Sequence, residues 1–298
     1  MNYSRILQQT IDLHVHIGPE IIPRKFLLPE LLKYEEGKLK GVGVKNHFFP
    51  TIAMNTKNTL KQKCPFVINS VTLNRYVGGF NANIVRASAE LSPRPIIVWF
   101  PTIYAENILK KQEFEIPPEW IDSKLKKKIK SRFSKDIKGL SILNSRGEIK
   151  EEVQNVLKTI KECGAILATG HISWQESQAL VKFATQKVRL KKVIITHPIY
   201  PEINMPIEIQ KELVKTGAFV EHCFSMYSID KIPIKQIANQ IRQVGPENCI
   251  LSSDVGQSFS PSPSEALKKF IYLLKEEKIT DEEIKIMLVT NPNKLIKF

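Results

Sequence analysis

Short apolar runs rich in Val and Ile recur along the chain, and segments with helical periodicity separate each run from the next. Such runs are typical of strands that are buried on both faces of a parallel sheet. A helix between successive strands makes neighbouring strands parallel. The eight runs are TIDLHVH (10–16), VGVKNH (42–47), FVINSVTL (66–73), PIIVWF (95–100), GAILATGH (164–171), KVIITH (192–197), GAFVEH (217–222) and CILSSD (249–254).

The chain has 298 residues, a length at which a (β/α)8 barrel routinely forms one domain around one core. Hydrophobic residues make up 42% and charged residues 25%, which are ordinary values for a globular protein. We therefore predict an α/β fold, a (β/α)8 TIM barrel, as a single domain over residues 1–298.

The interval between the fourth and fifth runs is far longer than the others, which predicts an insertion at about residues 104–150 after strand four. It contains a basic stretch, Lys124–Lys138, expected to be helical, and then GLSILNSRGEIK, which predicts a β-hairpin. Loops that follow barrel strands surround the active site, so this insertion is a candidate lid. The alternative is a decoration packed on the outside of the barrel.

The formal net charge is +14, and the stretch Lys124–Lys138 carries half of this excess, with eight basic residues and one acid. A solvated helix face accounts for such a stretch, so we expect no nucleic-acid partner. Attraction of an anionic substrate is the alternative. The chain has no apolar stretch long enough to cross a bilayer and no secretory h-region at its N-terminus. Its cysteines, Cys64, Cys163, Cys223 and Cys249, lack CxxC spacing, so we expect a cytoplasmic protein without disulfides and without a membrane partner.

All six histidines lie in or directly after an expected strand, and Asp254 ends the eighth. The carboxyl ends of barrel strands meet at one mouth, so these side chains converge there. Imidazole nitrogens and carboxylate oxygens are the ligands of catalytic zinc sites. The pattern therefore predicts a site for a divalent metal, zinc first, with Mn or Fe as alternatives. The histidines are His14, His16, His47, His171, His197 and His222.

The pattern of His14-Val15-His16, His171, His197 and Asp254 resembles the metal-binding pattern of the amidohydrolase superfamily. More narrowly, DLHVHIGPEIIPR, VKNH, LNRYVGG, ATGHIS, ITHP and DVGQ resemble a little-characterised amidohydrolase-like subgroup without an assigned substrate. The resemblance implies that His14 and His16 bind a first metal with Asp254. It also implies that His171 and His197 bind a second ion, or help to hold the first ion and the substrate. Asp254 would be the catalytic residue that takes a proton from the activated water.

Strand four departs from the superfamily pattern, because PIIVWF offers Trp99 where two-metal members place a carbamylated Lys or a Glu. Lys45 is the nearest replacement for that bridge, although contact with an anionic substrate or a strand-end carboxylate is the favoured role. His47 also follows strand two, at a place where PHP phosphoesterases bind metal.

Two further residues are candidates of second rank. Glu221 and His222 end strand seven, where only one of them faces the interior; His222 is a candidate ligand, and Glu221 could orient a metal-bound imidazole. Arg75 lies in LNRYVGGF, where it would bind a substrate anion or form a structural ion pair.

These residues predict a hydrolase that uses metal-activated water on an amide, cyclic amide or lactone of a small molecule. Three alternatives remain: a PHP-like phosphoesterase that uses Lys45 and Arg75, a metal-dependent decarboxylase with one ion, and a non-catalytic metal-binding barrel. A homo-oligomer is expected from base rates alone.

Overall fold

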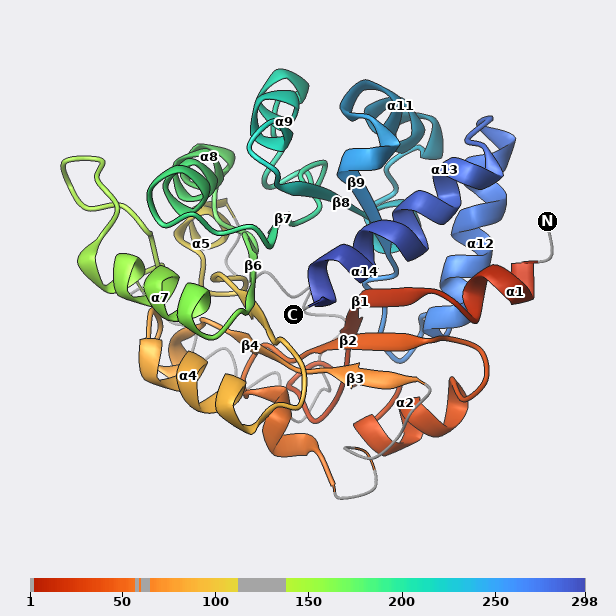
Figure 1. Ribbon diagram of the computed structural model, residues 1–298, viewed down its shortest axis with the longest axis horizontal. Coiled ribbons are helices and arrows are strands. Elements are labelled where there is room, and N and C mark those ends of the chain that lie inside the picture. Colours follow the sequence, from red (N-terminus) through yellow and green to blue (C-terminus); the bar gives the residue numbers. More distant parts are fainter. Residues whose placement is uncertain (1–2, 57–58, 60–64, 112–137, 298) are drawn as a thin grey trace.

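The computed structural model describes residues 3–56, 59, 65–111 and 138–297, and shows a mixed α/β fold with parallel strands (Figure 1). Each of the eight expected runs contains a strand. The strands are β1 (Ile11–His16), β2 (Gly41–Lys45), β3 (Phe66–Ile68), β4 (Ser70–Thr72), β5 (Ile97–Trp99), β6 (Ile166–Ala168), β7 (Val193–Ile195), β8 (Phe219–Cys223) and β9 (Cys249–Ser252).

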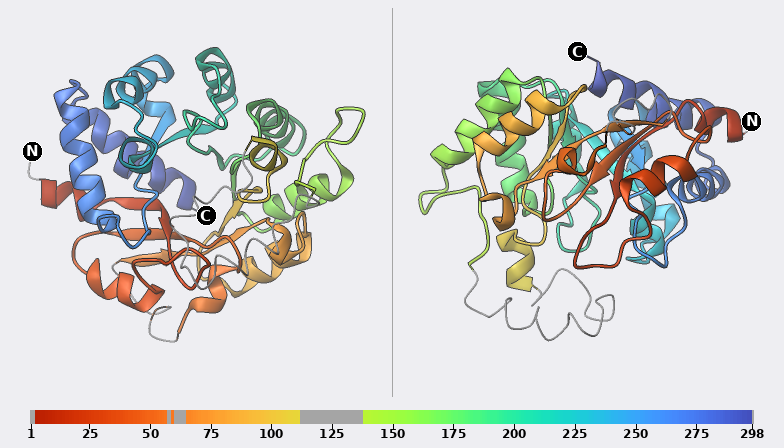
Figure 2. Two further views of the ribbon diagram at one scale, coloured as in Figure 1. Left: turned by 180° about the vertical axis from the view of Figure 1, so that it is seen from behind. Right: turned by 90° about the horizontal axis from the view of Figure 1, so that it is seen from below.

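Helices lie around the outside of the strands (Figures 1 and 2). The α-helices are α1 (Tyr3–Leu7), α2 (Leu28–Tyr34), α4 (Ala82–Leu91), α5 (Glu106–Lys111), α7 (Glu151–Glu162), α8 (Trp174–Lys182), α9 (Ile207–Val214), α10 (Phe224–Ser228), α11 (Ile234–Val244), α12 (Pro263–Glu276), α13 (Asp281–Lys285) and α14 (Asn291–Ile296). Short 3-10 and π-helical turns are η1 (Thr51–Met54), η2 (Arg75–Val77), η4 (Phe183–Lys187), η5 (Pro246–Asn248) and η6 (Ile286–Thr290).

The strands form two parallel sheets rather than one, in the orders β1-β2-β3 and β4-β5-β6-β7-β8-β9. The sheets separate at Asn69, which splits the expected run 66–73 into β3 and β4. The Asn69 side chain accepts hydrogen bonds from Thr51 Oγ1 and Asn55 Nδ2. Local side-chain bonding of this kind competes with a ladder, and the apolar pattern of the run does not predict it.

Hydrogen bonds join the two sheets at two places, between β2 and β4 and between the chain after β9 and β1. Beside Asn69, the hydroxyls of Ser70 and Thr72 donate to the carbonyls of Val44 (2.6 Å) and Asn46 (2.8 Å), so β4 stays next to β2. At the far edges, the chain after β9 meets β1. The amide of Asp254 donates to the His14 carbonyl, and the amide of His16 donates to the Val255 carbonyl, both at 2.8 Å.

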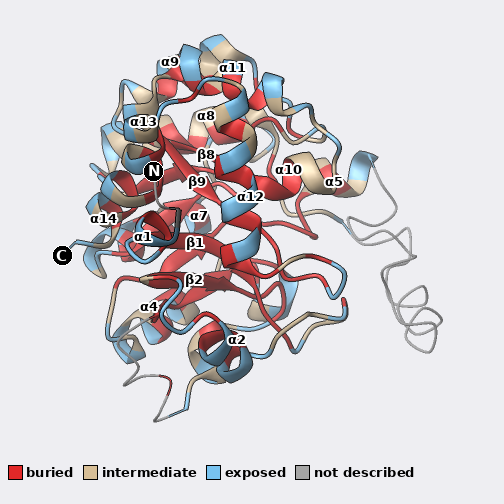
Figure 3. Cartoon of the chain, turned by 90° about the vertical axis from the view of Figure 1, so that its right-hand side faces the viewer, coloured by how far each residue is buried: buried red, intermediate tan, exposed pale blue. Residues whose placement is uncertain are grey.

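Apolar side chains fill both sides of the strands, as the unbroken apolar runs predict. Figure 3 shows the strands mostly in the colour of buried residues. The larger cluster lies between strands and helices. The smaller one collects alternate strand residues that share one face, and Leu295 of α14 packs against it. Its strand members are Ile11, Leu13, Phe66, Ile68, Ile97, Trp99, Ile166, Ala168, Ile194 and Ile250.

Three helices begin with a capping box, in which a hydroxyl and a glutamate three residues later satisfy backbone amides in both directions. These pairs are Ser173 with Glu176 at α8, Ser262 with Glu265 at α12, and Thr280 with Glu283 at α13.

Much of the expected insertion, residues 112–137 with most of the basic stretch, lies outside the described residues. Of its remainder, Leu143 and Ile149 form an antiparallel bridge around a turn at Asn144–Gly147. The helix α5 lies on the opposite side of the strands from α14 (Figures 2 and 3). Among the described residues, no helix combines the length and apolar character that a membrane span requires.

Candidate metal centre

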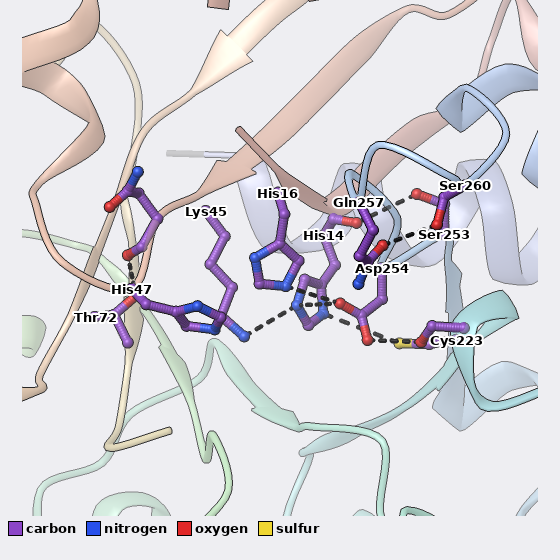
Figure 4. Close-up of polar contacts among 12 residues, drawn as sticks. His14, His16, Lys45, His47, Thr72, Cys223, Ser253, Asp254, Gln257 and Ser260 are labelled. Carbon is purple, nitrogen blue, oxygen red and sulfur yellow. Dashed lines mark hydrogen bonds and ion pairs between the residues drawn. The ribbon is translucent and has the colours of Figure 1, made fainter. Parts of the chain in front are cut away.

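The candidate site gathers side chains from the carboxyl ends of several strands (Figure 4). His14 and His16 belong to β1, and Lys45 is the last residue of β2. Trp99 ends β5, while Asp254 follows β9 by two residues. Because the strands are parallel, their carboxyl ends meet on the same side of the fold and bring these residues together.

Asp254 is the centre of the closest group. Its Oδ1 lies 3.0 Å from His14 Nε2 and 3.0 Å from His16 Nε2. Its Oδ2 accepts a hydrogen bond of 2.7 Å from Ser225 Oγ, which fixes the rotation of the carboxylate. Asp254 has a φ of 51°, a left-handed conformation that is uncommon for residues other than glycine and is held here by the backbone contacts to β1.

The contacts of His14 define which ring nitrogen carries the proton. Its Nδ1 lies 3.2 Å from Glu221 Oε2. Burial raises the pKa of Glu221, but His14, His197 and Ser252 together outweigh burial and lower it, so the carboxylate is ionised and can only accept hydrogen bonds. His14 therefore donates from Nδ1, which leaves the lone pair of Nε2 toward Asp254 and toward Lys45 Nζ at 3.1 Å. A metal-binding histidine is oriented in this way by an acceptor behind the ring.

Burial and neighbouring charges set the protonation of the other members. Burial raises the pKa of Asp254, but the imidazoles of His14, His16 and His197 outweigh it and hold the pKa well below its usual range. Burial and then Arg24 lower the pKa of His16 well below its ordinary value, and burial with His171 lowers the pKa of His197 to about 3. The imidazoles of His16 and His197 therefore stay neutral near an ionised carboxylate, and neutral imidazole with carboxylate is the donor set that zinc and similar ions need.

The group of His14, His16 and Asp254 fits a single divalent ion. One nitrogen or oxygen from each residue lies within 4.8 Å of the others. Nε2 of His14 and Oδ1 of Asp254 approach to 3.0 Å, so a cation bound by one of these atoms lies within reach of the other. The donor types and their approach therefore agree with a metal site.

His171 and His197 lie beside this group rather than within it. Their ring centroids are 4.8 Å apart, and the ring of His197 stacks on His14 at 5.9 Å. Within the described residues, Nδ1 of His197 is buried without a hydrogen-bond partner. His171 at 9% and Asp254 at 8% are the most exposed of the five expected ligands. A ligand that enters from solvent would therefore contact His171 and Asp254 first.

Glu20 and Arg24, in the loop after β1, belong to the site although the sequence did not single them out. Arg24 pairs with Glu20, and its NH2 group also contacts Nδ1 of His16 at 3.1 Å and of His47 at 3.4 Å. Both side chains are buried, at 1% exposure or less. Their only sequence signal is the Glu-x-x-x-Arg spacing in GPEIIPR, directly after the His-x-His motif.

Of the remaining candidate residues, some lie at the site and others lie away from it. Lys45 and His47 join the site, since His47 packs on His16 with centroids 4.7 Å apart. Glu221 faces His14, so alternation along β8 turns the buried His222 to the opposite face. Arg75 is exposed, donates to the backbone carbonyl of Lys138 and lies over Tyr104. Neither of its contacts involves the histidine cluster.

The fold is that of known amidohydrolases. An amidohydrolase from Pseudomonas aeruginosa matches with a TM-score of 0.63 and 8% identity, over 99% of this chain and 98% of that one. The probable dipeptidase PvdM from Pseudomonas aeruginosa matches with a TM-score of 0.61 and 10% identity, over 98% of this chain and 95% of that one. Identities this low show that this chain shares the fold of these two proteins.

Residues 9–221 match the model of a family of unknown function, DUF6282, and the chain belongs to this family. No curated protein matches it in sequence.

Proposed function

We propose that this protein is a metal-dependent hydrolase whose ion is bound by His14, His16 and Asp254. The observation that carries the proposal is the approach of Asp254 Oδ1 to the Nε2 atoms of both histidines, at 3.0 Å each. The amidohydrolase fold supports it, because the group lies at the strand ends where enzymes of such folds carry their active sites.

We also infer that the strands form one closed (β/α)8 barrel with an insertion after strand four. Counting β3 and β4 as a single interrupted strand gives eight. The hydrogen bonds from Ser70 and Thr72 to β2, and from Asp254 and His16 between β9 and β1, support closure at both joints. The apolar cluster of alternate strand residues supports a filled barrel interior.

A divalent ion held here would supply Lewis acidity and bring the pKa of a water molecule from about 15.7 to about 7. The residues of the chain do the rest. Asp254 takes the proton of the attacking water, and Ser225 holds its Oδ2 in place. Glu221 keeps the Nδ1 proton on His14, so that Nε2 remains a donor of electrons. His171, the most exposed of the five expected ligands, and the neighbouring His197 contact the substrate.

The substrate we propose is a small molecule with an amide, cyclic amide or lactone bond, because a carbonyl carbon is the electrophile suited to an activated water. Zinc is the proposed ion, since imidazole and carboxylate ligands suit it, and Mn or Fe would accept the same donors.

A phosphoesterase is a second candidate, and the geometry of His16, Glu20 and His47 favours it. One ligand atom from each of these residues lies within 4.8 Å of the others, which offers a place for a second ion. A second ion at this place would compete with Arg24, which forms an ion pair with Glu20 and contacts the imidazoles of His16 and His47. Two equivalents of bound metal would favour the phosphoesterase, and one would favour the hydrolase acting at carbon.

Elemental analysis of purified protein tests the proposal. Wild type should hold about one equivalent of zinc, and the double variant His14→Ala, His16→Ala should hold none. His222→Asn is the matched control, because it changes a buried histidine on the other face of β8 and should keep the metal. Esters, lactones, amides and phosphoesters would then be screened for hydrolysis. Metal-free wild type after reconstitution with zinc, manganese or iron would contradict the proposal.

A further inference from the structure

Lys45 places a cation beside His14. The residue is fully buried at the end of β2, and Figure 4 shows its side chain turned toward His14. Its Nζ lies 3.1 Å from His14 Nε2 and 4.5 Å from the centroid of the Trp99 ring. The contacts of the ammonium group include an imidazole nitrogen and an aromatic face.

An ammonium nitrogen only donates hydrogen bonds, so its partner atom on His14 must accept. Nδ1 of His14 already gives its proton to Glu221, and Nε2 is the atom with a free lone pair. That same lone pair is the one that points at Asp254 and would bind a metal ion. This lone pair can accept the hydrogen bond from Lys45 or bind a metal ion, but it cannot do both at once.

The charge around His14 explains why a cation is needed there when no ion is bound. The carboxylates of Asp254 and Glu221 both contact this ring and are both buried. A buried charge without a compensating partner is costly, so removing the nearby positive charge would destabilise the metal-free fold.

We propose that Lys45 is a built-in competitor for the metal, which holds His14 Nε2 in the metal-free protein and turns onto the face of Trp99 when the ion binds. This inference rests on the proposed function, since it takes His14 as a metal ligand. It makes Lys45 a positioning residue that sets the metal affinity. It also assigns Lys45 a role opposite to that of a bridging ligand, which would strengthen metal binding.

The test is a chelator titration of zinc-loaded protein at one fixed pH, with Lys45→Met and Lys45→Arg beside wild type. Lys45→Met should bind zinc at least about tenfold more tightly, the change expected from the loss of one competing charged hydrogen bond. Lys45→Arg keeps the charge and should stay close to wild type. Lys40→Met is the matched control, because Lys40 lies just before the other end of β2 and donates to Asn293.

Thermal unfolding of the metal-free proteins is the second readout. Without metal, Lys45→Met should unfold at a lower temperature than wild type. Bound zinc should remove this difference in unfolding temperature. Should Lys45→Met be recovered only with zinc, the chelator titration from the loaded state still gives the comparison.

Equal zinc affinity of Lys45→Met and wild type would overturn the proposal. So would weaker binding in both Lys45 variants, or an intact wild-type mass higher by one carbon dioxide on Lys45, since either would make this residue a ligand. These outcomes leave the proposed function standing as long as His14→Ala, His16→Ala abolishes binding. Absence of zinc binding in wild type and Lys45→Met alike would instead remove the proposed function and this inference together.

Discussion

The carboxylate of Glu221 on β8 lies 3.2 Å behind the ring of His14 on β1, and both side chains are fully buried. This contact joins two strands that are far apart in sequence and aims His14 Nε2 at Asp254. The fold therefore fixes the direction of the nitrogen that we propose as a metal ligand, which lowers the cost of ordering the site on binding.

Glu221→Gln should weaken zinc binding about 10- to 100-fold, the usual effect of losing an oriented partner behind a metal-bound imidazole. The amide keeps the shape of the side chain but loses the charge that holds the Nδ1 proton. Zinc affinity would be measured by chelator competition. Glu176→Gln is a matched control, because Glu176 is a buried glutamate that caps α8 and contacts Ser141. If both variants bind zinc as wild type does, Glu221 has no orienting role.

Asp254→Asn should lower turnover of any substrate found in the screen by roughly 10²- to 10⁴-fold, because the amide cannot take a proton from water. Zinc affinity should fall as well, since a charged ligand is lost. Ser225→Ala removes only the hydrogen bond to Oδ2 and should cause a smaller loss of turnover. Steady-state kinetics with metal content measured on the same samples would separate the two effects. Full activity of zinc-loaded Asp254→Asn would exclude Asp254 as the base.

The buried pair of Glu20 and Arg24 predicts strong coupling in a double-mutant cycle. Glu20→Gln or Arg24→Met alone leaves one charge buried without its partner, and each should cost about 3–5 kcal/mol of unfolding free energy. The double variant should be clearly more stable than the sum of the two single losses predicts. Denaturant unfolding of the four proteins measures this coupling, and simple additivity would mean that the pair does not interact.

His222 predicts a loss of stability as the pH falls. Burial lowers its pKa from 6.5 to about 3, and neither ring nitrogen has a hydrogen-bond partner within the described residues. Below pH 6.5 the unfolded chain takes up a proton that the folded protein refuses until about pH 3. Stability therefore falls over this window, by about 1.4 kcal/mol for each unit of pKa difference.

His222→Leu should remove that part of the pH dependence. Its unfolding free energy should equal or exceed that of wild type at neutral pH, and its advantage should grow toward pH 4. Denaturant unfolding at a series of pH values is the measurement. Parallel curves for the two proteins would show that His222 is protonated equally in both states.

The strands and the meeting of the main candidate ligands could be predicted because they depend on local pattern. Apolar runs define buried parallel strands, and parallel strands place His14, His16 and Asp254 at one edge whatever the loops do. Alternation along β8 also limits the direction of Glu221, because only one of Glu221 and His222 can face the same side as His14. These inferences need only the register of each strand.

The rest depends on loop paths that periodicity does not encode. The loop after β1 carries Arg24 next to Gln257 of the loop after β9, and this bridge brings the guanidinium to His16 and His47. Arg75 has a sequence context typical of anion binding, yet its turn directs it to the backbone of Lys138. The break at Asn69 likewise accompanies hydrogen bonds from Thr51 and Asn55, which an apolar strand pattern does not predict.

A crystal structure of the zinc-loaded protein, with anomalous scattering recorded at the zinc absorption edge, tests the central claim most directly. The account predicts a peak bonded to Nε2 of His14, Nε2 of His16 and Oδ1 of Asp254, with Lys45 Nζ moved from His14 toward the Trp99 ring. A peak held by other residues, or no peak in protein soaked with zinc, would contradict the account.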